Sequence, residues 1–412
     1  MDAVTTWDVV VVGGGFAGVA VADRLGKAGV SVLLVDRVDY HQFKPLNYQV
    51  ATAELGAAEV GRPLREIFRR RRSVQVAVDK ATAVDAATRT VTLASGARCA
   101  GRVLVVATGA EANFFGTPGA EHAFPMYTLA DAVRLRDRMR TVLDRADRPG
   151  RPPAELSVVV VGGGPTGVET AGAIADNLNS VIARTYRAGV AEAATVHLVD
   201  HGTELLKPFS ETSHRYARTA LESAGVRLHM GVAVAEIAAD RVRLSDDSVL
   251  PADVTVWAGG LQGGDLLTDS GLEIGRGGRV AVADTLEVPG HPGVYVLGDL
   301  AAIPDGTGGV LPQLGSVAQQ SGDWAAKNIL ADLRGGARTP FVYRDKGVMA
   351  MIGRGAAVAE IGASRRQLTG RLAFLAWLGV HLALLSGTRE KISAAATWLV
   401  DYGVRLRTRR SR

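Results

Sequence analysis

The strongest constraint on the fold of this chain is a twelve-residue segment that occurs twice. Residues 9–20 read VVVVGGGFAGVA, and residues 158–169 read VVVVGGGPTGVE. In each copy the four valines are typical of a buried parallel strand, and the glycines and small residues after them predict a tight turn and a helix. The chain therefore contains two strand–turn–helix units, and its 412 residues leave room for two or three domains.

The glycines of both copies have the G-x-G-x-x-G spacing of dinucleotide-binding turns. In the first copy, Gly13 makes the turn, Gly15 lets the backbone approach a pyrophosphate, and Gly18 allows close helix packing. The helix that follows offers amide donors and partial positive charge to the phosphates. The second copy repeats the pattern with Gly162, Gly164 and Gly167.

Each copy is followed by a second apolar strand that ends in an aspartate. Asp36 lies 18 residues after Gly18 and can accept a hydrogen bond from an adenosine ribose. Asp200 lies 33 residues after Gly167, so an extended helix or an inserted hairpin must occupy residues 177–193. A purely structural glycine turn is the alternative. No arginine directly follows Asp200, which favours NADH over NADPH.

The cysteine content and the charge distribution limit the redox chemistry, the compartment and the partners that this chain can have. The only cysteine, Cys99, cannot form an internal disulfide or a dithiol redox centre, and a cytosolic setting fits. The net charge is +5, but residues 365–412 carry +8 and the rest of the chain carries −3. A basic tail suggests an anionic surface such as a membrane or nucleic acid; a solvated terminus is the alternative.

Two further segments, RVLVVATGA at 102–110 and HPGVYVLGDLA at 291–301, flank the second copy. Together with the two glycine turns they resemble the two-dinucleotide flavoprotein reductases. Within that superfamily the chain is most similar to the type II NADH:quinone oxidoreductases. The segments that carry this resemblance include YHQFKPLNYQVATAEL at 40–55, TVWAGG at 255–260, LPQLGSVAQQSGDWAAKNI at 311–329 and FVYRDKGVMAMIGRGAAVAEIG at 341–362. Disulfide reductases and sulfide:quinone reductases need a cysteine pair, which this chain lacks.

The resemblance implies an α/β fold with two Rossmann-like dinucleotide-binding domains, the second inserted in the first, plus a C-terminal amphipathic helical membrane-anchoring segment. The FAD-binding domain is expected at residues 1–115 and 276–335, and the NADH-binding domain at 116–275. Residues 336–412 are expected to meet quinone and membrane. The expected cofactor-binding residues are Gly13, Gly15, Phe16, Ala17, Gly18, Asp36, Arg37, Lys44, Gln49, Ala107, Thr108, Gly109, Gly162, Gly164, Pro165, Thr166, Gly167, Glu169, Asp200, Gly259, Gly298, Asp299 and Gln319.

The resemblance also implies three catalytic residues. Glu169 is expected near nicotinamide and flavin, where a carboxyl group could relay protons; stabilisation by the helix dipole in the first turn is the alternative. Gln320 is expected to hydrogen-bond a quinone carbonyl, and a helix-surface amide is its alternative. Lys346 could approach the flavin or form a salt bridge with Asp345 or another acid.

The sequence departs from the family pattern in the quinone segment. The family commonly has AQxAxQ, whereas this chain has GSVAQQ, with Gly315 and Ser316 in the first two places. The expected reaction is hydride transfer from NADH to FAD and delivery of two electrons to a membrane quinone, menaquinone or ubiquinone, without proton pumping. The alternatives are a soluble NAD(P)H-dependent flavoprotein reductase with another acceptor and an NADH-sensing flavoprotein.

The C-terminal segment bears on localisation. Its apolar stretch at 371–386 is too short to span a bilayer, which takes about 20 residues. Trp377, Trp398 and Tyr402 among leucines, beside a basic end, favour a helix lying in an anionic membrane surface over a core helix or a dimer seam. We expect a peripheral, monotopic protein on the cytoplasmic face of the cell membrane, with a homodimer possible.

Two other features predict absences. RRRR at 69–72 is expected to be a solvated face, so no nucleic-acid partner is predicted. His41, His122 and His197 are scattered without the spacing of metal ligands, so no metal site is predicted.

Overall fold

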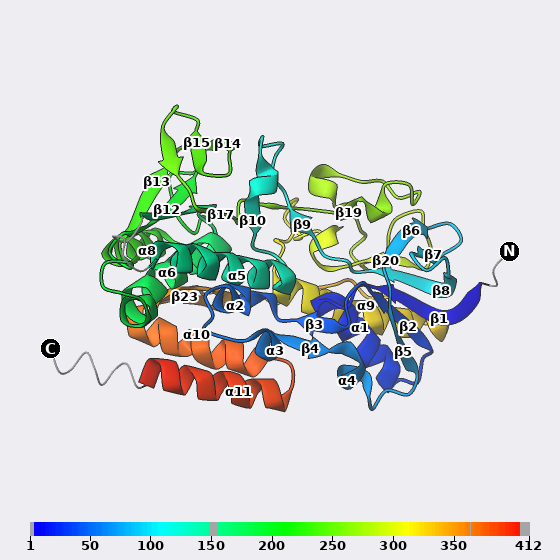
Figure 1. Cartoon of the computed structure of the whole chain (residues 1–412). Coiled ribbons are helices and arrows are strands. Elements are labelled where there is room, and N and C mark those ends of the chain that lie inside the picture. The colour runs from blue at the N-terminus through cyan, green and yellow to red at the C-terminus, as the bar shows by residue number, and fades with distance from the viewer. Residues whose placement is uncertain (1–3, 149–154, 363, 404–412) are drawn as a thin grey trace. The chain divides into compact units, whose positions relative to one another are not determined.

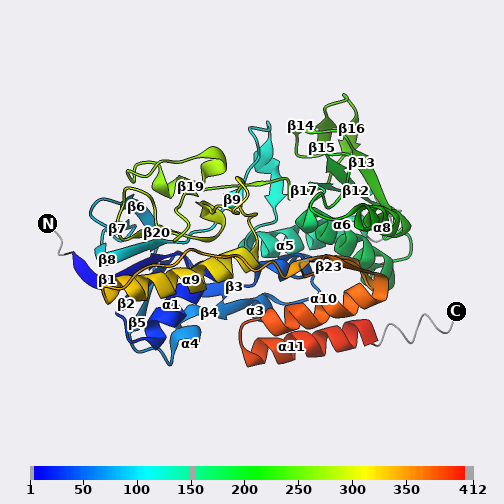
Figure 2. The ribbon, with the colours of Figure 1, turned by 180° about the vertical axis from the view of Figure 1, so that it is seen from behind.

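The chain folds into two compact units between which it passes several times (Figures 1 and 2). The computed structural model describes residues 4–148, 155–362 and 364–403. The first unit comprises Met1–Gln42, Arg62–Glu111 and Leu261–Arg344, and the second comprises Phe43–Gly61, Ala112–Gly260 and Asp345–Arg412. Residues from 345 onward therefore share a unit with the second glycine turn. The assignment of cofactors to residues 1–115, 116–275, 276–335 and 336–412 stays a prediction.

The first unit is built on a sheet with strand order β5-β2-β1-β8-β7-β6, to which β20 adds beside β8. The four-valine run forms the end of β1, which pairs in parallel with β2 and β8, whereas β7 and β6 are antiparallel. The bounds of these strands are β1 Thr5–Val12, β2 Val32–Asp36, β5 Val74–Val78, β6 Ala81–Asp85, β7 Thr90–Leu93, β8 Arg98–Val106 and β20 Val294–Val296.

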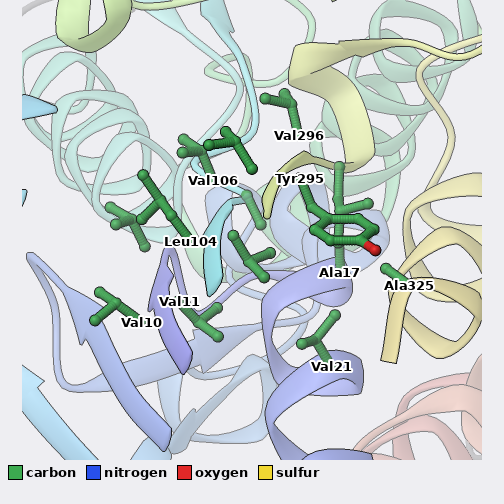
Figure 3. Close-up of a cluster of buried hydrophobic side chains, with 14 of the residues drawn as sticks. Val10, Val11, Ala17, Val21, Leu104, Val106, Tyr295, Val296 and Ala325 are labelled. Atoms are coloured by element: carbon green, nitrogen blue, oxygen red, sulfur yellow. The ribbon is translucent and has the colours of Figure 1, made fainter. Parts of the chain in front are cut away.

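The core of the first unit explains the unbroken valine run. Helices α1 (Phe16–Lys27) and α9 (Gly315–Leu333) belong to this unit, and a Cβ added to Gly322 of α9 would lie 2.4 Å from the carbonyl oxygen of Ala17. Figure 3 shows side chains of β1, β8 and β20 meeting those of α1 in this core. Because the strands are buried on both faces, they read as continuous apolar runs.

The second unit contains a parallel sheet with strand order β10-β17-β11-β12-β13. Its second valine run lies in the central strand β11, where all six side chains are buried. Helix α6 (Pro165–Asn177) follows and continues through residues 178–185, so the long spacing before Asp200 is filled by an extended helix. The other bounds are β10 Ala123–Pro125, α5 Leu129–Ala146, β11 Leu156–Val161, β12 Ala194–Asp200, α8 Glu211–Ser223, β13 Val226–Met230 and β17 Val254–Trp257.

The C-terminal part of the second unit is an antiparallel sheet, β22-β23-β24, followed by two helices. Helix α10 packs on β23, and α11 lies beside it, as the orange and red ribbons of Figures 1 and 2 show. In the described part of the chain, no helix combines the length and the apolar character needed to cross a membrane. The bounds are β22 Gly347–Gly353, β23 Ala356–Ile361, β24 Arg366–Thr369, α10 Gly370–Leu384 and α11 Thr388–Trp398.

Several shorter elements complete the two units. An antiparallel sheet, β14-β15-β16, extends the second unit after β13. The bounds of the short elements are α2 Asn47–Ala51, α3 Ala57–Val60, α4 Leu64–Phe68, α7 Ala183–Thr185, β14 Val234–Ile237, β15 Arg241–Leu244, β16 Val249–Pro251, β19 Val280–Ala281 and β21 Ala301–Ala302. The arginines of the basic tail beyond residue 403 lie outside the described residues.

Candidate functional site

The first glycine turn joins β1 to α1 and requires glycine at two of its positions. Gly13 has φ of 106°, and an added Cβ would lie 2.3 Å from the carbonyl oxygen of Ala107. A Cβ added to Gly18 would lie 1.8 Å from the carbonyl oxygen of Gly13. At Gly15, by contrast, nothing lies within 4 Å of an added Cβ. This open side of the turn is where a pyrophosphate can approach the backbone.

The second glycine turn, between β11 and α6, repeats this geometry closely. Gly162 has φ of 115°, and an added Cβ would lie 2.5 Å from the carbonyl oxygen of Ala258. A Cβ added to Gly167 would lie 1.8 Å from the carbonyl oxygen of Gly162, and Gly164 faces open space. The two turns are thus the same backbone structure built twice.

The two strand-end aspartates have a role that the sequence did not reveal. One oxygen of Asp36 accepts a hydrogen bond from the Gly14 amide at 2.5 Å, and the other accepts from the amide of Val38. Asp200 does the same with the amides of Gly163 (2.6 Å) and Gly202. Each carboxylate therefore clamps the middle glycine of its turn. Since a carboxylate has about four acceptor sites, capacity for a ribose hydroxyl remains.

The helices after both turns begin without a side-chain cap. Gly15 precedes α1 and Gly164 precedes α6, and neither helix has an acidic residue in its first turn. Helix α5 of the same chain, in contrast, starts with a capping box made by Thr128 and Asp131. Because no side chain competes for the first amides of α1 and α6, their N-termini fit the pyrophosphate groups of two dinucleotides.

Glu169 lies on α6 where this helix packs against β22. Its Oε1 accepts a hydrogen bond from the Met351 amide at 3.2 Å. A Cβ added to Gly172 would lie 1.7 Å from the carbonyl oxygen of Ile352, so helix and strand are in direct backbone contact. Glu169 is the fifth residue of α6, outside its first turn. The interpretation that the helix dipole explains this glutamate was therefore wrong.

The surroundings of Glu169 favour its protonated form. The residue keeps some exposed surface, but its carboxyl group is enclosed by protein, and this burial raises its pKa to about 8. The Met351 amide and the indole of Trp377 partly oppose the rise. Trp377 is fully buried, and its Nε1 makes no hydrogen bond of normal geometry in the described part of the chain. Glu169 thus carries a proton at neutral pH.

A second acid, which sequence reasoning missed, lies in the same unit. Glu54 follows α2, is only 8% exposed, and accepts a hydrogen bond from Tyr402 Oη at 3.2 Å. Its Oε1 lies 3.6 Å from Nη2 of Arg354. Glu54 and Arg354 occur in the segments that carry the family resemblance, but no spacing links residues 54, 354 and 402. Only the fold brings them together.

Comparison with known proteins identifies the family. The family model of the pyridine nucleotide-disulphide oxidoreductases matches residues 7–322. The type II NADH:quinone oxidoreductase Ndh of Mycobacterium tuberculosis is 36% identical over 98% of this chain and 89% of its own length. The chain belongs to the type II NADH:quinone oxidoreductase family.

One further relative and one solved structure are also similar to this chain. The demethylphylloquinone reductase NdbB of Synechocystis is 27% identical over 95% of both chains. The fold is similar to that of NDH2 from Plasmodium falciparum, solved in complex with NADH, with a TM-score of 0.88 over 95% of this chain and 97% of that one at 16% identity. Family membership confirms the predicted α/β fold, the use of FAD and NADH, and the class of NADH:quinone oxidoreductase. It does not favour the alternative reductase or sensor functions.

In the first unit, the late GD segment meets the first glycine turn, as the family resemblance implies. Gly298 has φ of 67°, and an added Cβ would lie 3.5 Å from the Cβ of Ala17. A Cβ added to Gly315 would contact the ring of Phe16 at 3.4 Å. Asp299, directly after Gly298, is partly buried. The remaining expected FAD residues Arg37 and Thr108 are exposed, whereas Ala107 and Gly109 are buried or partly buried.

In the second unit, Gly259 takes the place at the second turn that Thr108 takes at the first. A Cβ added to Gly162 would lie 3.0 Å from the Gly259 amide, and one added to Gly13 would lie 2.9 Å from the Thr108 amide. Pro165 is the first residue of α6, and Thr166 next to it is exposed. Gly259 and Pro165 thus lie at the second turn, and Thr108 lies at the first.

Lys44 and Gln49 have clear surroundings within the second unit. The Nζ of Lys44 lies 3.6 Å above the centre of the Tyr127 ring. Gln49 is fully buried, donates from Nε2 to Tyr48 Oη at 3.2 Å and accepts from Trp398 Nε1 at 2.9 Å. These two hydrogen bonds hold α11 to α2, and the expected contact of Gln49 with a cofactor stays a prediction.

The three other expected contact residues are placed as follows. Gln320 exchanges two hydrogen bonds with the backbone of Arg344, both of 3.1 Å, and so anchors that segment to α9. Gln319 next to it is exposed, and Ser316 bonds the hydroxyl of Tyr343 at 2.9 Å. Lys346 is exposed and forms no ion pair among the described residues, and Asp345 pairs with Arg365. The alternative of a Lys346 salt bridge was therefore wrong, and the expected approach of Lys346 to the flavin stays a prediction.

Proposed function

We propose that this chain oxidises NADH and reduces a membrane quinone, with FAD held by the first unit and NADH by the second. The observation that carries the proposal is the pair of matching glycine turns, each with an open helix N-terminus and a clamped aspartate. Bound FAD would supply the two-electron chemistry that links NADH oxidation to quinone reduction. The protein's own part is to bind, to orient and to handle protons.

The two strand-end aspartates each have a role in binding a nucleotide in the proposed function. The amides at the starts of α1 and α6 hold the pyrophosphates, and Asp36 and Asp200 accept hydrogen bonds from the ribose hydroxyls. His201 and Gly202 follow Asp200, so no arginine is adjacent to receive a 2′-phosphate. The second unit should therefore prefer NADH to NADPH.

Glu169 is the proton donor of the proposed reaction. Conversion of a quinone to its quinol takes up two protons, and NADH brings only one with its hydride, so one proton must come from water. With a pKa raised to about 8 by burial, Glu169 holds such a proton at neutral pH and can release it. Its hydrogen bond to the Met351 amide fixes the carboxyl group in one orientation.

The outer face of the C-terminal helices supports peripheral attachment to a membrane. Helix α10 buries Ala373, Phe374, Trp377 and His381 inside the second unit. The C-terminal helices and the turn after them also expose large apolar side chains, namely Leu372, Leu375, Val380, Leu384, Ile392, Leu399 and Val400. Leu399 is 74% and Leu372 68% exposed. An apolar face of this kind inserts into the boundary between headgroups and acyl chains.

His381 does not oppose this attachment. Its ring stacks on Trp377 with centroids 3.8 Å apart, and its Nδ1 lies 2.8 Å from the Trp377 carbonyl oxygen. Burial lowers its pKa to about 4, so it is neutral and points inward. We place the protein on the cytoplasmic face of the membrane, where NADH is supplied.

Stopped-flow kinetics test the reaction. We expect NADH to reduce the bound flavin faster than NADPH does, and a menaquinone or ubiquinone analogue to reoxidise it. Reduction by NADH without reoxidation by either quinone would instead support a reductase with another acceptor.

Membrane partition tests the attachment separately. Replacing Leu372, Leu375 and Leu399 together with serine should release the protein to the soluble fraction without touching the packed side of α10. Val249, an exposed valine of β16, provides the matched control as Val249→Ser. Equal membrane binding of the triple variant and the control would contradict the proposal.

A further inference from the structure

Side chains from widely separated parts of the sequence enclose a small polar chamber in the second unit. Its titratable lining groups are Tyr48, Glu54, Glu169, Asp176, Arg354 and Tyr402. The volume of the chamber is about 10 Å³, roughly the space that one water molecule needs. Glu169, the proton donor of the proposed function, and Glu54, which has no role so far, therefore share one polar space.

Arg354 indicates that the chamber holds water. Its backbone amide bonds to Asp176, and its guanidinium lies 5.6 Å from the centre of the Tyr402 ring. The Nε, Nη1 and Nη2 atoms are all buried, yet none makes a hydrogen bond within the described residues. The Glu54 carboxylate, at 3.6 Å from Nη2, pairs with the guanidinium by charge but is too far away for a hydrogen bond. Because buried N–H donors without hydrogen bonds are costly, a water that accepts from the guanidinium and reaches the nearby carboxyl groups is the simplest way to satisfy it.

Glu54 is held so that it can carry a proton. Its pKa is raised to about 7, mainly by burial and to a smaller extent by Asp176 and Asp401, while Arg354 and the Tyr402 hydroxyl oppose the rise. It therefore exchanges protons near neutral pH, while Glu169 in the same chamber has a pKa of about 8. Tyr48, the remaining lining group, is raised well above its usual pKa and stays protonated.

We propose that Glu54 is a proton-relay residue of the quinone reductase reaction, which reloads Glu169 through a water in the chamber. This inference rests on the proposed function, since it needs Glu169 to give up a proton in each turnover. In the relay, the Glu54 carboxyl group gives its proton to the water while the water gives one to the Glu169 carboxylate. Glu54 then takes a proton from solvent. One proton passes per quinol formed, and no electrons move.

The competing explanation is structural. Glu54 could simply link Arg354 and Tyr402 and so hold the C-terminal segment in place. That role would affect folding and every activity equally, whereas a relay affects only reactions that consume a proton. Ferricyanide accepts electrons without protons, so it separates the two explanations.

The decisive variant is Glu54→Gln, which keeps the shape but cannot carry the proton. We expect its NADH:quinone rate at pH 7, where Glu54 still carries a proton in part of the molecules, to fall about tenfold. This is less than the 10²–10⁴-fold typical of a direct general acid, because water can partly bypass the relay. Its NADH:ferricyanide rate should equal that of the wild type. Glu54→Asp should recover most of the quinone rate. An unchanged quinone rate across pH 6–9, or a parallel loss with ferricyanide, would overturn the proposal.

Tyr402→Phe gives an independent test, because it should extend quinone reduction to higher pH where Glu54→Gln should reduce it. The Tyr402 hydroxyl lowers the pKa of Glu54, so its removal should raise that pKa and move the alkaline fall of the quinone rate to higher pH. If Glu54→Gln does not yield folded flavoprotein, this shift decides alone, and its absence would refute the relay. Failure of the proposed function looks different: the wild type would then reduce ferricyanide but no quinone.

Discussion

The two nucleotide turns of this chain share a backbone but differ in what covers the helix that follows. A Cβ added to Gly18 or to Gly167 would lie 1.8 Å from the carbonyl oxygen of the first glycine of the same turn. In the first unit, α9 packs on α1, with Gly322 against Ala17. In the second, strand β22 packs on α6, with its backbone against Gly172.

This difference in packing changes the surroundings of the residue that follows each turn on its helix. Ala20 and Glu169 hold equivalent places, two residues beyond the last glycine. On α6 the amide of Met351 on β22 points to that place, and burial there raises the pKa of a carboxyl group to about 8. The steric demands of the turn are the same in both units, whereas the raised pKa on which the proposed proton transfer depends comes from the enclosure of Glu169 in the second unit.

The largest effect should come from filling the turns themselves. Gly18→Ala should yield protein without FAD, whereas Gly167→Ala should retain FAD and lose at least about tenfold in NADH affinity. Overpacking against a backbone carbonyl typically costs about 1–3 kcal/mol or more. The flavin absorbance of purified protein and its titration with NADH report the two losses. Loss of flavin from both variants would show that the turns do not serve separate cofactors.

Glu169→Gln on α6 should impair quinone reduction, whereas a change at the equivalent place on α1 should not. We expect its NADH:quinone rate at pH 7 to fall about 100-fold, as on removal of a general acid, with NADH:ferricyanide activity retained. The wild-type quinone rate should decline as pH rises through 8, where Glu169 loses its proton. Ala20→Gln, at the equivalent place on α1, is the matched control and should leave both rates unchanged. Wild-type quinone kinetics in Glu169→Gln would remove Glu169 from the mechanism.

Glu169→Gln, which should lower the quinone rate, should raise the stability of the folded protein at high pH. Because the pKa of Glu169 is raised in the folded protein, the folded state binds more protons than the unfolded one between about pH 4.5 and 8. Stability is therefore lost across that range as pH rises. Glu169→Gln should gain on the order of 2 kcal/mol at pH 9, discounted from 1.36 kcal/mol per pKa unit, and nothing at pH 4. Thermal unfolding at both pH values, with the exposed Glu155→Gln as control, measures this.

A smaller effect should distinguish the two clamping aspartates. Asp200→Asn keeps an oxygen acceptor for the Gly163 amide but removes the charge that repels a 2′-phosphate, so the preference for NADH over NADPH should shrink about tenfold, or 1.4 kcal/mol. Asp36→Asn should leave this preference unchanged. Steady-state kinetics with both nucleotides test the pair, and a shift caused by Asp36→Asn instead would exchange the assigned cofactors.

Local sequence was enough to predict the strands and both turns, and it gave an extended helix as one of two alternatives after Gly167. Glycine positions follow from steric limits within a few residues, and unbroken valine runs follow from burial on both faces of a sheet. It was not enough for side chains such as Gln49 and Gln320. Each has an amide that bonds a distant segment, Trp398 and the Arg344 backbone, and a helical pattern carries no sign of such partners.

The sequence by itself determined that this protein holds two dinucleotides, because the turn that grips a pyrophosphate is encoded in adjacent residues. Only the tertiary structure brought together the acids that we propose as proton carriers. Glu54 and Arg354 lie 300 residues apart in the sequence, with Glu169 between them. They line one chamber because β22 and the C-terminal turn pack beside α6 in the folded chain. The proton affinity of a carboxyl group depends on burial and neighbours in space, and those exist only in the folded chain.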